Sequence, residues 1–230
     1  MNEILFFILL LSLASLVLLA FKLGKIYLYG VIAVLSVMMN IVVVKPFDLF
    51  GITTYGGNAI YGCIFLATDL LAEHFGKKEA MKAVRIGFFS LIIYFLISFI
   101  YTKININLEI EGAENIQNSL NTIFSPALGI AIASISAFFV SNTFDVNFYD
   151  FIHKKTGNSF LWLRNNLSTL ISQFLDTLIF TLIASLFGIF SWEIFWEVIF
   201  FAYIFKLFVA LLDTPFLYLS KLKFFRKNLS

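Results

Sequence analysis

Long apolar runs, interrupted by short polar clusters, follow one another along almost the whole chain. A membrane-spanning helix needs about 20 mainly apolar residues, and these runs have that length. We therefore predict an all-α polytopic membrane protein with seven transmembrane helices. The predicted spans are Glu3–Phe21, Ile26–Val44, Thr54–Phe75, Val84–Tyr101, Ile123–Thr143, Arg164–Phe190 and Ile194–Leu219.

Lysine and arginine gather in every second connection between these spans. The basic connections contain Lys22 and Lys25, then Lys77, Lys78, Lys82 and Arg85, then Lys154, Lys155 and Arg164, and finally Lys221, Lys223, Arg226 and Lys227. The connection from Lys103 to Thr122 instead contains Glu109, Glu111 and Glu114. Because basic loops remain in the cytoplasm, this alternation predicts an N-terminus outside and a cytoplasmic C-terminus, which seven spans allow.

The connection from Lys45 to Asn58 differs from the others. Pro46, Gly51, Gly56 and Gly57 interrupt an apolar stretch that lacks the charge of a solvated loop. Irregular backbone at membrane depth lines the binding cavity in some transporters. A plain hairpin outside the membrane explains the same residues equally well, so both interpretations are open.

Composition excludes several classes of protein. The chain is 60% hydrophobic and 13% charged, with a mean hydropathy of +0.94, which does not fit a soluble domain. Sixteen Lys and Arg against 14 Asp and Glu leave a net charge of +2, which excludes a basic nucleic-acid-binding surface. The 30 phenylalanines, with abundant Ile, Asn and Lys, indicate an AT-rich bacterial genome.

The sequence predicts no cofactor and no metal. Its lone Cys63 excludes an intramolecular disulfide and a cysteine metal site, and His74 and His153 lie at the ends of apolar runs, where solvated side chains are expected. The chain has no P-loop motif for ATP. Uphill transport by this chain would therefore need an ion gradient, a separate ATPase or trapping of the cargo after entry.

Ionisable residues near or inside the predicted spans indicate function. A charge at bilayer depth costs roughly 2.5–3.5 kcal/mol on insertion scales, so each one implies a partner or a wet cavity. We expect these side chains to face the interior of the bundle; they are Asp69, Glu73, Asp145, Asp176, Lys206 and Asp213.

The sixth predicted span carries a polar stripe, because its polar residues recur at intervals of three or four. The stripe consists of Arg164, Asn165, Ser168, Thr169, Ser172, Gln173 and Asp176. Hydrogen bonding between helices explains the Ser and Thr residues as well as a transport role does, whereas for Gln173 and Asp176 we favour a functional role. Asp176 and Lys206 have similar depth on adjacent spans, and we predict that they neutralise each other.

Four motifs in the right order carry a resemblance to a known family. They are Phe65-Leu66-Ala67-Thr68-Asp69-Leu70 with Phe75-Gly76, Phe144-Asp145-Val146, Leu167-Ser168-Thr169-Leu170 with Asp176-Thr177, and Tyr203-Ile204-Phe205-Lys206. From about Ile26 to Leu222 the chain resembles the queuosine precursor transporter branch of the vitamin uptake transporter family. The resemblance implies a six-helix core in a bacterial inner membrane. It also implies import of deazaguanine bases such as preQ0, preQ1 or queuine without an obligatory ATPase.

The first predicted span lies outside the family pattern. We therefore divide the chain into an additional N-terminal transmembrane helix (residues 1–25), a six-helix transporter core (26–222) and a basic cytoplasmic tail (223–230). The added span puts in doubt the cytoplasmic N-terminus that is usual in the family, in agreement with the charge pattern.

The implied cargo suggests roles for the buried residues. A deazaguanine presents an N–H and an amino group side by side, a pair that one carboxylate accepts while an amide serves the neighbouring carbonyl. Substrate contacts are predicted for Asp69, Asn165, Ser168, Gln173, Asp176, Lys206 and Asn40. Gating or ion pairing is predicted for Glu73, Asp145 and Arg164. We expect Glu73 and Asp145 near the cytoplasmic face, beside Lys77, Lys78, Lys154 and Lys155.

Two other functions compete with a secondary transporter or facilitator. A substrate-binding subunit of an energy-coupling-factor vitamin transporter would have a comparable number of helices and an ATPase partner. An intramembrane enzyme would use the buried carboxylates as acids or bases, but no catalytic triad or metal-ligand set lies on facing spans, so we expect no enzyme. The expected partners are a deazaguanine base and the lipid bilayer; a homo-oligomer is left open and nucleic acid is excluded.

Overall fold

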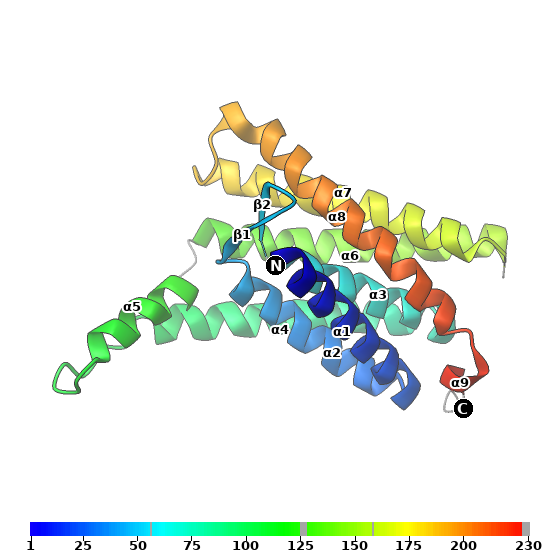
Figure 1. The fold of residues 1–230 in the computed structure, drawn as a ribbon, viewed down its shortest axis with the longest axis horizontal. Helices are drawn as coiled ribbons and strands as arrows, with labels where there is room; N and C mark the ends of the chain where they lie inside the picture. Colours follow the sequence, from blue (N-terminus) through cyan, green and yellow to red (C-terminus); the bar gives the residue numbers. More distant parts are fainter. Residues whose placement is uncertain (56, 125–127, 158, 227–230) are drawn as a thin grey trace.

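The computed structural model describes residues 1–55, 57–124, 128–157 and 159–226. Its long helices are α1 (Asn2–Leu23), α2 (Lys25–Val42), α3 (Gly57–Phe75), α4 (Lys77–Tyr101), α6 (Leu128–Thr156), α7 (Leu161–Leu186) and α8 (Phe195–Leu219). The shorter elements are the strands β1 (Pro46–Leu49) and β2 (Ile52–Tyr55), helices α5 (Ala113–Phe124) and α9 (Lys223–Arg226), and the 3₁₀ turn η1 (Trp192–Ile194). Figure 1 shows the long helices packed along one another.

Six segments are long and apolar enough to cross a membrane: α1, α2, α4, α6, α7 and Trp192–Leu219, which joins η1 to α8. The third predicted span corresponds to α3, which has 19 residues but is more polar. Helices α1, α2, α4, α6 and α8 all contact α3, and most of its side chains are buried. The chain is therefore a mostly helical, polytopic membrane protein with a polar helix at its centre.

Helix α6 departs most from its predicted boundaries. It continues to Thr156, well beyond the predicted end at Thr143, because Asn142 and Asp145 face the interior and do not mark a membrane surface. Helix α4 begins at Lys77, before its predicted start at Val84, since its charged first turns extend the helix beyond the apolar stretch.

The connection between α2 and α3 is an antiparallel β-hairpin. Strands β1 and β2 pair with Leu49 opposite Ile52, and the two turn residues Phe50 and Gly51 have φ of 52° and 79°. Positive φ at both turn positions matches the twist of a tight hairpin, and glycine adopts it readily. The connection is therefore a hairpin, and its location outside the membrane stays a prediction. The Asn2 side chain donates to the Asp48 carbonyl (3.1 Å), so the start of α1 lies at this hairpin end.

The basic residues meet at the opposite end of the bundle, which we call the basic end. Here the Lys25 ammonium lies 3.5 Å from the Glu79 carboxylate, and the Lys77 ammonium lies 3.9 Å from the Asp150 carboxylate. The Lys22 ammonium lies 3.4 Å from the centre of the Phe224 ring. The C-terminal helix α9 also lies here, away from the hairpin (Figure 1). Basic groups that are far apart in sequence thus share one end, as the loop pattern predicts.

A helix that was not predicted follows α4. The segment from Lys103 to Thr122 is predicted to be a loop, but in the structure most of α5 forms within it. This helix projects from the body of the molecule (Figure 1). Ile116, Leu120 and Phe124 recur every four residues in an otherwise polar segment, which gives the helix one apolar face. Such a helix is too short and too polar to be found by a search for membrane spans.

Two glycines permit close packing between helices. A Cβ atom on Gly62 of α3 would lie 2.3 Å from Val209 Cγ1 of α8, and one on Gly87 of α4 would lie 2.5 Å from Phe138 Cζ of α6. Small residues at such contacts let membrane helices approach one another. The close α3–α8 contact brings the polar residues of α8 to the centre of the bundle.

Candidate functional site

Asp176 is the centre of a polar cluster formed by four helices, which we call the ion-pair cluster. Its carboxylate accepts hydrogen bonds from Tyr61 of α3 (2.5 Å), Ser141 of α6 (3.2 Å) and Lys206 of α8 (2.5 Å). Asn142 donates to the Tyr61 hydroxyl (3.3 Å). The Asp176–Lys206 ion pair confirms the predicted neutralisation, and both side chains are nearly buried.

A second group of charges, the carboxyl cluster, consists of Asp69 of α3, Asp145 of α6 and Asp213 of α8. Asp69 and Asp145 are close enough to interact with each other electrostatically, and both interact with Asp213. All three side chains are almost completely buried. Helix α7 supplies their neutral partners: Thr169 donates to Asp69 (3.4 Å), Ser172 to Asp145 (2.9 Å) and Asn165 to Asp213 (3.0 Å).

The carboxyl cluster lacks donors. Asp69 Oδ1, Asp145 Oδ2 and Asp213 Oδ2 are buried and have no hydrogen-bond partner among the described residues. The same is true of Asn165 Oδ1, although the Asn165 amide nitrogen bonds to Asp213. A buried polar atom without a partner costs about 1–3 kcal/mol, so four such atoms at one place need a physical reason.

Glu73 holds the basic end together through a third group, the Glu73 network. The buried Arg164 guanidinium donates twice to the Glu73 carboxylate, at 2.6 and 3.0 Å, and also to the carbonyls of Gly157 (3.0 Å) and Ser159 (2.8 Å). Lys221 (2.9 Å) and the Tyr149 hydroxyl (2.7 Å) complete the shell around Glu73. The network joins α3, α6, α7 and the segment after α8.

Comparisons with known proteins decide the family. A sequence profile described as a putative vitamin uptake transporter matches residues 55–220. The chain belongs to this family. It is 38% identical, over 199 residues, to a Bacillus subtilis (strain 168) protein named probable queuosine precursor transporter; the match covers 86% of this chain and 85% of that protein. No solved structure matches. Membership of the vitamin uptake transporter family makes the chain a transporter and not an enzyme.

The three groups account for most of the site residues predicted in this vitamin uptake transporter family member. Asp176 and Lys206 lie in the ion-pair cluster, Asp69 and Asp145 in the carboxyl cluster with Asn165 bonded to it, and Glu73 and Arg164 in the Glu73 network. The expected position of Asp145 near the basic end, beside lysines, is wrong: its side chain is completely buried and bonds to Ser172. Glu73 lies at that end, but its cations are Arg164 and Lys221.

Three other predicted residues have different surroundings. The Ser168 hydroxyl donates to the backbone carbonyl of Asn165 (3.3 Å) and interacts with Asp145. Gln173 is buried with an unpartnered Oε1. Asn40 of α2 accepts a hydrogen bond from Ser134 of α6 (3.0 Å), at a separate contact.

Ser141, Asn142 and Tyr149 belong to these groups although none was predicted as a site residue. Tyr61 belongs to them as well, and so does Asp213, which was predicted only to face the interior. A signal for Tyr61 was available, because Tyr61, Asp69 and Glu73 are separated by multiples of four residues and share one face of α3. On α6, Asn142, Asp145 and Tyr149 are separated by three and four residues, so they also share one face of their helix.

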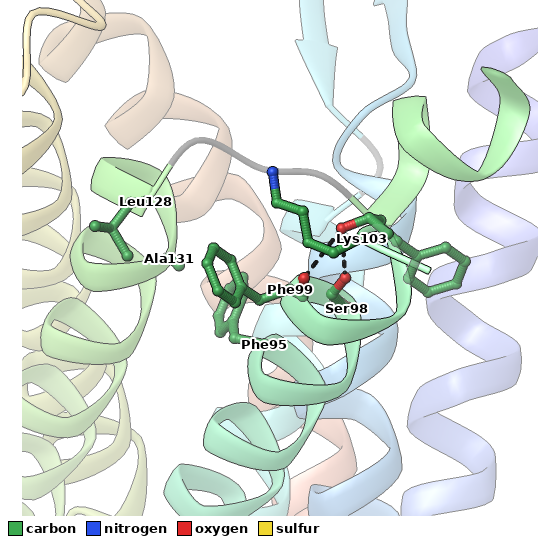
Figure 2. A pocket seen from close by; sticks show the side chains of 8 residues that line it. Phe95, Ser98, Phe99, Lys103, Leu128 and Ala131 are labelled. Carbon is green, nitrogen blue, oxygen red and sulfur yellow. Dashed lines mark hydrogen bonds between the residues drawn. The ribbon is translucent and has the colours of Figure 1, made fainter. Parts of the chain in front are cut away.

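A cavity of about 150 Å³ lies elsewhere, between the end of α4 and the start of α6. Figure 2 shows Phe95, Phe99 and Leu128 on its walls, with Lys103 beside them. No residue of the three polar groups lines it. Among the described residues, no group of His, Cys, Asp and Glu is arranged to hold a metal ion.

Proposed function

We propose that this chain imports a deazaguanine precursor of queuosine across the bacterial cytoplasmic membrane, as a secondary transporter or facilitator. The observation that carries the proposal is the similarity, over 86% of the chain, to a protein named probable queuosine precursor transporter. The buried polar groups between α3, α6, α7 and α8 support it, because a purely structural bundle would not keep so many ionisable side chains at depth.

The ion-pair cluster is our proposed recognition site. The edge of a deazaguanine base carries a carbonyl acceptor, an N–H donor and an amino donor in a row. If Asp176 and Lys206 separate, the carboxylate accepts the two donors and the ammonium donates to the carbonyl. The unpartnered Oε1 of Gln173, three residues before Asp176, adds a further acceptor on the same stripe. Tyr61 supplies a ring close to Lys206 for stacking of the base.

We assign seven transmembrane helices to the transporter, with α3 as the third and with the basic end in the cytoplasm. The six apolar segments and the central α3 alternate in direction along the chain, and the ends that carry Lys22, Lys77, Lys154 and Lys221 come together. The excess of Lys and Arg at that end supports a cytoplasmic location. The start of α1 and the hairpin then lie outside.

In this orientation, the Glu73 network is a cytoplasmic gate. It joins α3, α6 and α7 at the basic end, and we propose that these bonds close the route by which the cargo leaves toward the cytoplasm. On this proposal, the gate is closed when Arg164 is bonded to Glu73.

Thermal-shift binding on the detergent-purified chain tests the recognition site. We expect preQ0, preQ1 or queuine, but not a panel of vitamins, to raise the melting temperature of the wild type; a ligand at 100 times its Kd adds about 2.7 kcal/mol. Asp176→Asn should abolish the shift, while the matched control Asp48→Asn, in the exposed hairpin, should retain it. A shift with a vitamin alone would contradict the cargo, and a full shift in Asp176→Asn would contradict the site.

Uptake in cells tests the mechanism. A host that lacks its own carrier and cannot make the base should accumulate labelled preQ0 when it expresses this chain alone. Absence of uptake despite confirmed membrane expression would contradict an autonomous transporter. Co-purification of a P-loop ATPase would then indicate a substrate-binding subunit of an energy-coupling-factor transporter.

A further inference from the structure

We propose that the carboxyl cluster of Asp69, Asp145 and Asp213 is a proton-binding site that couples import of the cargo to proton entry. The proposal rests on the proposed import function. It adds a driving force, because a proton taken up by the cluster from outside and released to the cytoplasm moves in the same direction as the cargo.

No cation among the described residues is bonded to the three aspartates of the carboxyl cluster. The cations that the described structure places in the interior are bonded elsewhere, Arg164 to Glu73 and Lys206 to Asp176. The three aspartates have Thr169, Ser172 and Asn165 as partners, all of them neutral. Three ionised carboxylates that interact electrostatically and lie out of water repel one another strongly, so the site is stable only when it binds positive charge.

Buried oxygen atoms in and beside the carboxyl cluster lack hydrogen-bond donors. Asn165 is completely buried, and its amide group touches Asp213 through the nitrogen, yet its oxygen has no donor. A protonated carboxyl group is itself an O–H donor. A proton on Asp69 or Asp145 also removes the electrostatic repulsion between these two carboxylates.

The size of the site favours a proton over other cations. The cluster is buried by close packing of α3, α6, α7 and α8, and the described residues offer no metal-ligand arrangement. A sodium ion would need several oxygen ligands around a cavity, and an organic cation would need more space still. A proton needs neither.

The other ionisable groups on the helices that pack around the cluster do not supply the missing charge. They are Cys63, which interacts with Asp213, Tyr149, which interacts with Asp69, and further along the helices Glu73, Arg164, Asp176 and Lys206. Helices α2 and α4, on another side of α3, contribute Tyr29 and Glu79, which bond to each other. Helix α1 contributes Lys22, which lies over Phe224 at the basic end.

The test uses the full chain in proteoliposomes, with labelled preQ0 and with the membrane potential held at zero. For one proton per cargo, each unit of inward pH gradient should raise the accumulation ratio up to about tenfold, and a protonophore should abolish the rise. Uptake that is independent of the gradient would overturn the coupling while leaving the import function intact. No uptake or exchange under any condition would count against the import function itself.

Aspartate-to-asparagine variants test the location of the proton site. Asp145→Asn and Asp213→Asn each mimic a carboxyl that never releases its proton. At least one should keep the exchange of labelled for unlabelled preQ0 across the membrane but lose the response to the pH gradient. Asp48→Asn is the matched control and should respond as the wild type does. If every variant that keeps exchange also keeps the gradient response, the carboxyl cluster is not the coupling site.

Discussion

Arg164 shows how one side chain can satisfy a buried charge completely. Its three nitrogens donate to the Glu73 carboxylate, the Tyr149 hydroxyl and two backbone carbonyls, although no part of it reaches solvent. A planar guanidinium provides five donors in a fixed fork, which an ammonium does not. The identity of this residue, and not only its charge, is therefore important for stability.

We expect Arg164→Lys to lower the free energy of unfolding by about 1–3 kcal/mol, because the lysine keeps the charge but cannot reproduce the forked contacts of the guanidinium with the Glu73 carboxylate and the two backbone carbonyls. Lys221→Ala, which removes a partly exposed partner of the same Glu73, should cost less than about 1 kcal/mol. Thermal denaturation in detergent measures both. Equal losses in the two variants would show that the fork geometry is unimportant.

The Asp176–Lys206 pair allows a double-mutant test. Lys206→Ala alone leaves a buried carboxylate without its cation and should cost about 3–5 kcal/mol. The double variant Lys206→Ala with Asp176→Asn should be more stable than Lys206→Ala, because no uncompensated charge remains. The measurement is the melting temperature of each variant. A double variant no more stable than Lys206→Ala would disprove the energetic coupling of Asp176 and Lys206.

The partner of a buried charged residue can be predicted from the sequence when the depth of the residue in its span determines which side chain it meets. Asp176 and Lys206 fall at the same depth on consecutive spans, so their contact was predictable. The partners of Asp145 were not, because an error in the end of α6 moved this residue from the interior to the membrane surface. Asp69, Asp145 and Asp213 come from three helices, and only the packing of those helices shows that they meet.

At the scale of elements, α3 is unusual because it lies at the centre of the bundle and yet is not among the six most apolar segments. It tolerates Asp69 and Glu73 since five other helices cover it. A search for apolar runs still finds this helix, because Ile60–Ala72 contains only one charged residue, Asp69. The same reading misses α5, whose single apolar face gives no long run, and it stops α6 early at polar residues that point inward.

The contact between α3 and α8 depends on Gly62. We expect Gly62→Ala to destabilise the protein by about 1–3 kcal/mol, because the added Cβ would lie 2.3 Å from Val209 Cγ1. The double variant Gly62→Ala with Val209→Ala should recover part of the loss. Gly30, with no atom within 4 Å of an added Cβ, is the matched control, and Gly30→Ala should be neutral or slightly stabilising. Similar melting temperatures for Gly62→Ala and the wild type would contradict a tight contact.

At the scale of the whole molecule, the two ends differ in charge. The hairpin and the start of α1 share one end, whereas the basic residues of several connections share the other. The sequence predicts this asymmetry without knowledge of the packing, because it depends only on the order of spans and loops.

The orientation can be tested by labelling single cysteines in a Cys63→Ser background with a membrane-impermeant maleimide. Asp48 and Lys78 are exposed at opposite ends. We expect Asp48→Cys to react in intact cells and Lys78→Cys to react only after the membrane is permeabilised. The reverse pattern would place the N-terminus in the cytoplasm.

Glu73 is bound by two cations from different parts of the chain, and this has a consequence for how the inner exit opens. Arg164 belongs to α7, while Lys221 follows α8. If Glu73 acts as the gate proposed above, a movement that separates it from Arg164 would leave the carboxylate paired with the Lys221 ammonium. Opening of the proposed gate would then exchange one ion pair for another at Glu73, while Arg164 would keep its bonds to the carbonyls of Gly157 and Ser159.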